Sequence, residues 1–217
     1  MPRITAISDL HGHFPKLPGG DLLIVAGDLT GKDSDKEHLD FIEWMHESNY
    51  KKKIYCPGNH DNFLFDIKRH GKIKTPKEWN IEYLCDYLTE FEGLKIYGIP
   101  WTYRFKGINP KCCAFTCAED DHEFMMAKCE AIPDDTDILI THGPPLNILD
   151  ETIDGRNVGC QFLREHVIAR VKPKLHLFGH IHEMGSRMVD TVMTKFANCS
   201  YVDEKYKPRG KIMEFEL

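Results

Sequence analysis

The sequence has 217 residues, the size of one domain with room for a substantial core. Hydrophobic residues make up 41% and charged residues 29%, the proportions of an ordinary globular protein. The net charge of −6 and the pI of about 6.0 show no basic stripe of the kind that tracks a nucleic-acid backbone, which weighs against non-specific nucleic-acid binding. We therefore expect a single domain over residues 1–217 and no stable nucleic-acid binding.

The composition also bears on location and redox state. The apolar runs are strand-length, far short of the ~20 residues that span a bilayer, and no secretory hydrophobic region follows Met1. The cytoplasm is therefore the expected location, with no membrane partner. The eight scattered cysteines are expected to be reduced thiols that pack as small hydrophobic groups. Cys112, Cys113 and Cys117 have the local density of a zinc site, but no second pair with ligand spacing follows.

Apolar runs along the chain predict strands at residues 4–8, 21–26, 52–56, 81–84, 95–99, 137–141, 174–178, 194–198 and 211–217. A capping-box pattern at Ser34 and Glu37 predicts a helix that ends near Asn49. Its core-facing stripe is predicted to be Leu39, Ile42, Trp44 and Met45. Further helices are predicted at residues 62–69, ending at Gly71, and at 119–131 and 159–171. Strands that alternate with helices and then follow one another predict a layered α/β fold with two packed sheets.

Side chains that bind metals follow five of these strands. In chain order they are Asp9 and His11; Asp28; Asn59, His60 and Asp61; His142; His180 and His182. Glycine stands beside most of them and allows the backbone to turn sharply at the end of a strand. Because parallel strands point their carboxyl ends to one side, we expect these side chains to converge in one crevice. The alternative for Asp9 and Asp28, taken singly, is that they cap helices.

The number and kind of these groups favour a pair of metal ions. A tetrahedral zinc ion takes four ligands, whereas seven candidates are present, so two ions bridged by one carboxylate fit better. Mixed oxygen and imidazole ligands suit zinc, manganese or iron better than calcium or magnesium alone. Two ions about 3.5–4 Å apart can hold a phosphoryl group and ionise a water for in-line attack. His60 could then give a proton to the leaving group, and Asp61 is placed to orient its imidazole.

The ordered blocks around Asp9, Asp28, Asn59, His142 and His180 resemble those of the calcineurin-like metallophosphoesterases. Residues 144–145, 157–160 and 173–176 are most similar to the small metallophosphoesterase-domain proteins that act on phosphodiesters, including cyclic nucleotides. The resemblance implies a four-layer α/β/β/α sandwich of two mixed sheets flanked by helices. It also implies hydrolysis of small nucleotide-like phosphodiesters by a metal-bound hydroxide.

The resemblance further implies a role for each site residue. Asp9, His11 and His182 would hold the first metal, Asp28 would bridge, and Asn59, His142 and His180 would hold the second. His60 would stabilise the transition state or protonate the leaving oxygen, with Asp61 as its partner. The expected cofactor is a pair of divalent ions, Mn²⁺ first, with Fe, Zn²⁺, Ni²⁺ or Mg²⁺ as alternatives. The expected partner is a small phosphoester substrate, and the pattern implies nothing about oligomeric state.

Several alternatives stay open at the level of the sequence. The function could instead be that of a phosphomonoesterase or phosphoprotein phosphatase, a nuclease, or a non-catalytic scaffold with this fold. Arg156 is a candidate to bind the substrate phosphate, against the alternative of a solvated loop arginine. Trp101 and Tyr103 could stack on a base or pack at the rim of the core. Outside the motifs, His13 is assigned to a loop and His176 to a strand, and five histidines are expected to be solvated: His38, His46, His70, His122 and His166.

Overall fold

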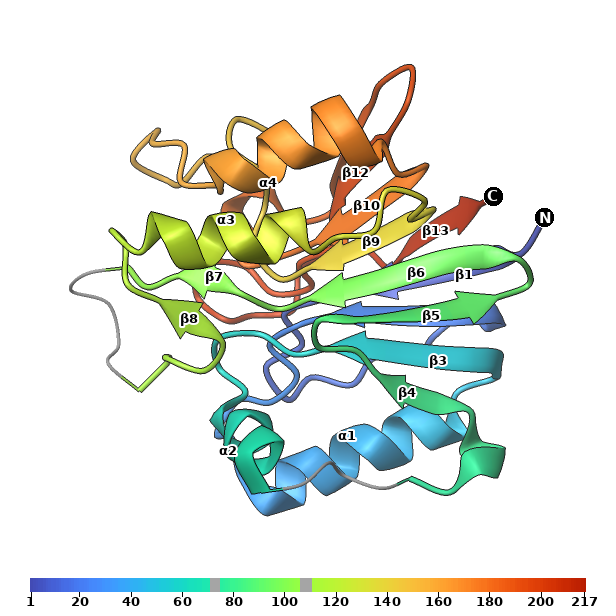
Figure 1. Ribbon diagram of the computed structural model, residues 1–217. Coiled ribbons are helices and arrows are strands. Elements are labelled where there is room, and N and C mark those ends of the chain that lie inside the picture. The colour runs from blue at the N-terminus through green and yellow to red at the C-terminus, as the bar shows by residue number, and fades with distance from the viewer. Residues whose placement is uncertain (71–74, 106–110) are drawn as a thin grey trace.

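The computed structural model describes residues 1–70, 75–105 and 111–217, and it forms two β-sheets that pack face to face between helices (Figure 1). In the first sheet, β1 (Arg3–Ile7), β2 (Gly20–Ala26), β3 (Tyr50–Cys56) and β4 (Ile81–Tyr83) run parallel. β13 (Met213–Glu216) joins the edge antiparallel to β1. The strand order is therefore β13-β1-β2-β3-β4.

The second sheet has a parallel centre and two antiparallel edges. Its central strands are β6 (Leu94–Ile99), β9 (Ile138–Thr141), β10 (Leu175–Phe178) and β12 (Lys195–Asn198). β5 (Tyr87–Phe91) pairs with β6 at one edge and β11 (Arg187–Asp190) with β12 at the other. The strand order is β11-β12-β10-β9-β6-β5, and the two short strands β7 (Thr102–Tyr103) and β8 (Thr116–Cys117) form a separate pair.

Helices cover the outer face of each sheet, which gives four layers. α1 (Asp35–Glu47) and α2 (Asn62–His70) lie against the first sheet, with the 3₁₀ turn η1 (Lys77–Trp79) nearby. α3 (His122–Glu130) and α4 (Gln161–His166) lie against the second sheet, and α4 continues into the wider turn η2 (Val167–Val171). The 3₁₀ turn η3 (His182–Met184) follows β10. The predicted four-layer α/β/β/α sandwich of two mixed sheets is confirmed.

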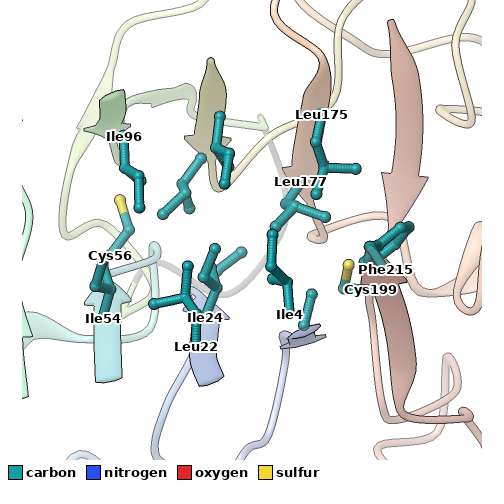
Figure 2. Packing of buried hydrophobic residues seen from close by; sticks show 14 of the residues in the cluster. Ile4, Leu22, Ile24, Ile54, Cys56, Ile96, Leu175, Leu177, Cys199 and Phe215 are labelled. Carbon is teal, nitrogen blue, oxygen red and sulfur yellow. The ribbon is translucent and has the colours of Figure 1, made fainter. Parts of the chain in front are cut away.

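Three apolar clusters hold these layers together. The central one fills the space between the sheets with side chains from both, among them Ile24, Ile54, Ile96 and Leu177 (Figure 2). A second cluster packs the first sheet on α1, and a third packs the second sheet on α3 and α4. The central strands are buried on both faces, which explains why they are continuous apolar runs in the sequence.

The predicted core face of α1 is right at Ile42 and Met45 and wrong at Leu39. Leu39 is 68% exposed, whereas the buried residues are His38, Phe41, Ile42 and Met45, a spacing of i, i+3, i+4, i+7. A polar residue occupies the first position of the stripe because the His38 ring meets the Asp33 carboxylate at 3.0 Å. The expectation that His38 is solvated is therefore also wrong.

Other local predictions hold in part. The Ser34 side chain caps α1 through the amide of Glu37, but the Glu37 carboxylate accepts from the amide of Lys32 and does not complete the capping box. Both edge strands of the second sheet, β5 and β11, were absent from the prediction. The predicted end of α2 at Gly71 lies outside the described residues. Among the described residues, no helix has the length and apolar character needed to cross a membrane.

Candidate metal centre

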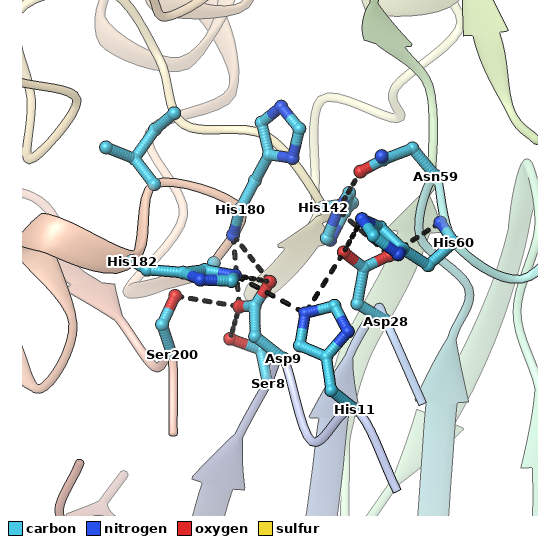
Figure 3. A network of polar contacts seen from close by, with 12 residues as sticks. Ser8, Asp9, His11, Asp28, Asn59, His60, His142, His180, His182 and Ser200 are labelled. Atoms are coloured by element: carbon cyan, nitrogen blue, oxygen red, sulfur yellow. Dashed lines mark hydrogen bonds and ion pairs between the residues drawn. The ribbon is translucent and has the colours of Figure 1, made fainter. Parts of the chain in front are cut away.

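The candidate ligands stand on the turns that follow β1, β2, β3, β9 and β10, as predicted, and they meet where the two sheets come together (Figure 3). The ends of the sheets are joined there by backbone hydrogen bonds, Ser8 N to Cys199 O and Tyr201 N to Ser8 O. Both sheets therefore contribute to one site.

The backbone at this site is held in an unusual conformation. Asp9, His11, Asp28 and His180 have φ between 43° and 68°, in the left-handed region. This region costs a non-glycine residue about 1–2 kcal/mol, and Asp and His enter it more readily than branched residues do. The concentration of four such residues at the strand ends indicates that the fold maintains this geometry for the site.

The first group of ligands surrounds Asp9, whose side chain is buried. Its Oδ1 lies 3.3 Å from His182 Nε2, and its Oδ2 accepts hydrogen bonds from the hydroxyls of Ser8 and Ser200. His182 Nε2 lies 3.4 Å from His11 Nε2. One atom from each of Asp9, His11 and His182 falls within a sphere of metal-binding size, with all three atoms within 4.8 Å of one another.

The second group surrounds Asp28. Its Oδ1 lies 3.3 Å from His142 Nε2, which in turn lies 2.9 Å from Asn59 Oδ1. Asp28, His142 and His180 form a second cluster within 4.8 Å. The other oxygen of Asp28, Oδ2, lies 3.7 Å from His11 Nε2 of the first group. Asp28 therefore stands between the two groups, the position that a bridging carboxylate needs.

Backbone carbonyls set the orientation of two ligand rings. The Nδ1 of His142 lies 3.2 Å from the carbonyl oxygen of Ala26, and the Nδ1 of His182 lies 3.1 Å from that of Asp203. In the neutral ring, donation from Nδ1–H to a carbonyl leaves the Nε2 lone pair of each ring directed into the site, where a metal ion can take the place of a proton.

The donor set fits a pair of divalent cations on three further observations. The buried His180 Nε2 has no hydrogen-bond partner among the described residues, as a nitrogen reserved for a metal would. The described side chains that form ion pairs with Asp9 and Asp28 are all histidines. A Cβ atom at Gly179 would overlap the Asp9 carboxylate, and one at Gly58 would overlap Asp28. Glycine at these two positions therefore leaves the space that the carboxylates of Asp9 and Asp28 occupy, which any larger residue would fill.

The buried carboxylates create a field that attracts positive charge. Burial alone would raise the pKa of Asp28, but the neighbouring rings of His142 and His60 outweigh it and hold the pKa well below its usual range. Burial likewise opposes protonation of His142, yet Asp28 raises its pKa to about 9. The pKa of Asp9 is lowered as well, so both buried carboxylates are ionised. Their negative charge attracts divalent cations as it attracts protons on the neighbouring rings.

His60 lies at the centre of the two ligand groups, but its expected partner, Asp61, does not contact its ring. The His60 Nε2 is 3.8 Å from Asp28 Oδ2, and these two residues with His11 form a third cluster of metal-binding size. The buried Asp61 carboxylate instead accepts from the backbone amides of Gly58, Asp28 and Leu29 at 2.7–3.1 Å. The structure therefore corrects the prediction that Asp61 orients the His60 ring: Asp61 ties two ligand-bearing turns together.

A cavity of about 300 Å³ opens above the cluster. Its described lining includes Asp28, Asn59, His60, His180 and His182. It also includes residues outside the predicted site: Arg104, Phe105, Cys112, Thr116, Thr152, Ile181, Glu183, Glu204 and Tyr206. Phe105 stacks on the His180 ring at 5.4 Å, and Tyr206 meets the His11 ring edge-on at 4.7 Å. The sequence around these lining residues has no helical or strand periodicity. Only their place on loops could have marked them as candidates for the cavity wall.

Other predicted residues lie outside the cluster. Arg156 does not line the cavity; its side chain is 74% exposed and pairs with Asp154 at 2.6 Å. Trp101 packs against Phe115 and Phe124 at the rim of the core, whereas Tyr103 lines the cavity. Cys117 is buried, and the described clusters of metal-binding size contain no cysteine, so they give the Cys112–Cys117 region no zinc site.

Comparison with known proteins gives consistent matches. The family model of the calcineurin-like phosphoesterases matches residues 2–184, which contain every candidate metal ligand. Metallophosphoesterase domain-containing protein 1 of Homo sapiens and of Mus musculus is 35% identical, over 95% of this chain and 68% of theirs. The solved structure of phosphopantetheinyl hydrolase from Mycobacterium tuberculosis has a TM-score of 0.61 at 19% identity, covering 98% of this chain and 95% of that one. At that identity the structural similarity shows a shared fold alone.

Proposed function

This chain belongs to the calcineurin-like phosphoesterase family, and from that membership we propose that it hydrolyses small, nucleotide-like phosphodiesters with two divalent metal ions. The observation that carries the proposal is the convergence of seven oxygen and imidazole donors, five of them on buried residues, in two adjoining groups beneath one cavity. A protein that used the fold only as a scaffold would gain nothing from four strained ligand residues.

The assignment of ligands follows the two groups. Asp9, His11 and His182 would hold one ion, and Asn59, His142 and His180 the other, with Asp28 shared between them. Bound divalent ions supply neutralisation of the phosphoryl charge and activation of water. We propose Mn²⁺ as the ion in use, since mixed oxygen and imidazole donors accept it readily.

The protein's own groups position the substrate and handle the proton. His60 is only partly buried and its Nε2 faces the centre of the cluster, so it can hold a proton at Nε2 for the departing ester oxygen. Asp61 acts through the backbone, because its carboxylate fixes the turns that carry Asp28 and Asn59.

The cavity supports a diester over the alternative substrates. Its volume suits a small molecule, and Phe105 and Tyr206 give it aromatic walls. Among its described lining residues, Glu183 and Glu204 are acidic and Arg104 is basic. A diester carries one negative charge and a monoester nearly two, so acidic lining disfavours the monoester more. The net charge of −6 disfavours a long nucleic acid in the same way, and we propose action on small cytoplasmic phosphoesters.

The direct test is a substrate panel on metal-depleted protein. Chelator-treated protein should not hydrolyse a chromogenic phosphodiester, and Mn²⁺, Zn²⁺, Mg²⁺ or Ni²⁺ added in turn should restore turnover to different extents. Cyclic nucleotides and linear diesters should be hydrolysed faster than the matched monoesters. Faster turnover of phosphoserine peptides than of any diester would favour a phosphoprotein phosphatase instead.

His60→Ala tests the proposed proton donor. Positioned proton transfer contributes about 10²–10⁴-fold, so turnover should fall by that order for a diester with an alkoxide leaving group. The loss should be smaller for p-nitrophenolate, which departs without a proton, and metal content should not change. Equal losses would mean that His60 stabilises phosphoryl charge, and a lost ion would mean that His60 is a ligand, as its cluster with His11 and Asp28 allows.

A further inference from the structure

We propose that Cys112 is a positioning residue that fixes the orientation of the His60 ring, the role that the sequence assigned to Asp61. This inference rests on the proposed function, because it concerns the group that would protonate the leaving oxygen. The Cys112 Sγ lies 3.4 Å from His60 Nδ1, within hydrogen-bonding distance for sulfur. On the opposite side of the same ring, Nε2 faces Asp28 Oδ2.

The other described contacts of the ring do not distinguish its two nitrogen atoms. His11 meets it edge-on at a centroid distance of 4.7 Å, and Tyr206 lies at 6.0 Å with a tilt of 58°. Such ring contacts allow the imidazole to turn about its bond to Cβ, which would exchange Nε2 for a carbon atom at the centre of the site. A polar atom at Nδ1 prevents that exchange, and Cys112 supplies it.

The chain holds Cys112 against the motif that carries His60. The Asn62 side-chain amide donates to the carbonyl oxygen of Lys111 at 2.9 Å, and the backbone amide of Ala114 donates to that of Asn59 at 3.2 Å. These two hydrogen bonds flank Cys112 on both sides. The backbone that carries Cys112 is therefore held against the turn between β3 and α2, and the residue lines the cavity beside His60.

Asp61 cannot take this role in the observed arrangement. Its carboxylate is fully buried and accepts from three backbone amides. Turning it toward the ring would leave those buried amides without acceptors, which is costly. A neutral sulfur orients the imidazole without adding another negative charge beside Asp9 and Asp28.

The test compares Cys112→Ala, Cys112→Ser and Cys113→Ala on two phosphodiesters, one with an alkoxide and one with a p-nitrophenolate leaving group. We expect Cys112→Ala to lower kcat about 10-fold on the alkoxide substrate, less on the nitrophenolate, with KM and metal content unchanged. Cys112→Ser keeps a polar atom at this position and should recover most of the loss. Cys113 is the matched control, because its Sγ faces Asn62 Oδ1 at 3.7 Å and not His60; its variant should keep the wild-type ratio between the two substrates.

A double variant and an NMR spectrum distinguish positioning of the His60 ring from a general loss of structure at the site. If Cys112 acts through His60, adding Cys112→Ala to His60→Ala should lower kcat no further. In metal-free protein, Cys112→Ala should move the ¹⁵N resonance of His60 Nδ1 and leave those of His142 and His182 in place. An unmoved resonance, or multiplicative losses in the double variant, would overturn the inference. Wild-type protein that hydrolyses neither diester would instead refute the proposed function, and the spectrum would still decide the role of Cys112.

Discussion

Burial of His176 should lower the free energy of unfolding in acid, and the size of this loss follows from the groups that surround its ring. The side chain is fully buried on β10, between the rings of Phe178 and Phe196. Its Nε2 lies 3.0 Å from the hydroxyl oxygen of Thr141, whose own proton goes to Gly143 O at 2.7 Å. Nε2 is therefore the donor, and Nδ1 has no partner among the described residues. A second proton would have to sit on Nδ1 and face apolar groups.

Burial accordingly lowers the pKa of His176 from 6.5 to about 3. The unfolded chain then binds a proton that the folded chain does not, so the destabilisation is absent above pH 6.5 and grows as the pH falls toward 3. At pH 5 the unfolded side chain is almost fully protonated and the folded one is not. The resulting loss of unfolding free energy is about 2 kcal/mol, from 1.36 kcal/mol per unit over the interval between 6.5 and 5.

Urea denaturation of the metal-free protein at pH 7.5 and pH 5.0 measures this effect. Other histidines also titrate, so the relevant quantity is the difference between wild type and His176→Leu. The drop in unfolding free energy between the two pH values should be about 2 kcal/mol smaller in the variant. His46→Gln, which removes a solvent-exposed imidazole, controls for the loss of a histidine. An identical drop in wild type and His176→Leu would refute the reasoning.

Three further predictions concern the site and the core. Asp28→Asn should lower kcat on a phosphodiester more than any other single ligand change, because it weakens the ligand that both ions would share. Near-normal kcat with full metal content would show that Asp28 does not bridge. Gly179→Ala should abolish metal retention, since the added Cβ overlaps the Asp9 carboxylate and the Ser8 hydroxyl; metal analysis after dialysis checks it, and normal retention would contradict the packing. Ile24→Ala should lower the free energy of unfolding by about 2–5 kcal/mol, since it opens a cavity between the two sheets. A loss below 1 kcal/mol in urea denaturation would mean that the central cluster repacks.

The parts of this fold that the sequence predicted are those with a strong local signal. The central strands are buried on both faces and therefore read as continuous apolar runs, and β2, β9 and β10 are each followed by a glycine next to a metal-binding side chain. The edge strands β5 and β11 gave no such signal, because β11 is exposed and β5 is only partly buried. The core face of α1 was misjudged since a buried histidine, His38, occupies a position where the pattern called for an apolar residue.

The same difference between local and distant signals applies to the residues of the site. The candidate ligands could be found because each stands in a short block with recognisable residue types. The partners of those blocks could not, because they come from distant parts of the chain. Cys112 meets His60 across 52 positions of sequence, and Tyr206 reaches His11 from the C-terminal region. The role of Asp61 was missed for a different reason: its partners are backbone amides, which have no sequence signature.

The central claim is that this chain holds two metal ions side by side, and a calorimetric titration of metal-free protein with Mn²⁺ tests it most directly. Activity toward a chromogenic phosphodiester would be followed in parallel samples at each ratio of metal to protein. Two ions per chain should bind, and turnover should rise with occupancy of the second. Saturation at one ion with full activity, or full activity before any ion is added, would contradict the two-metal account.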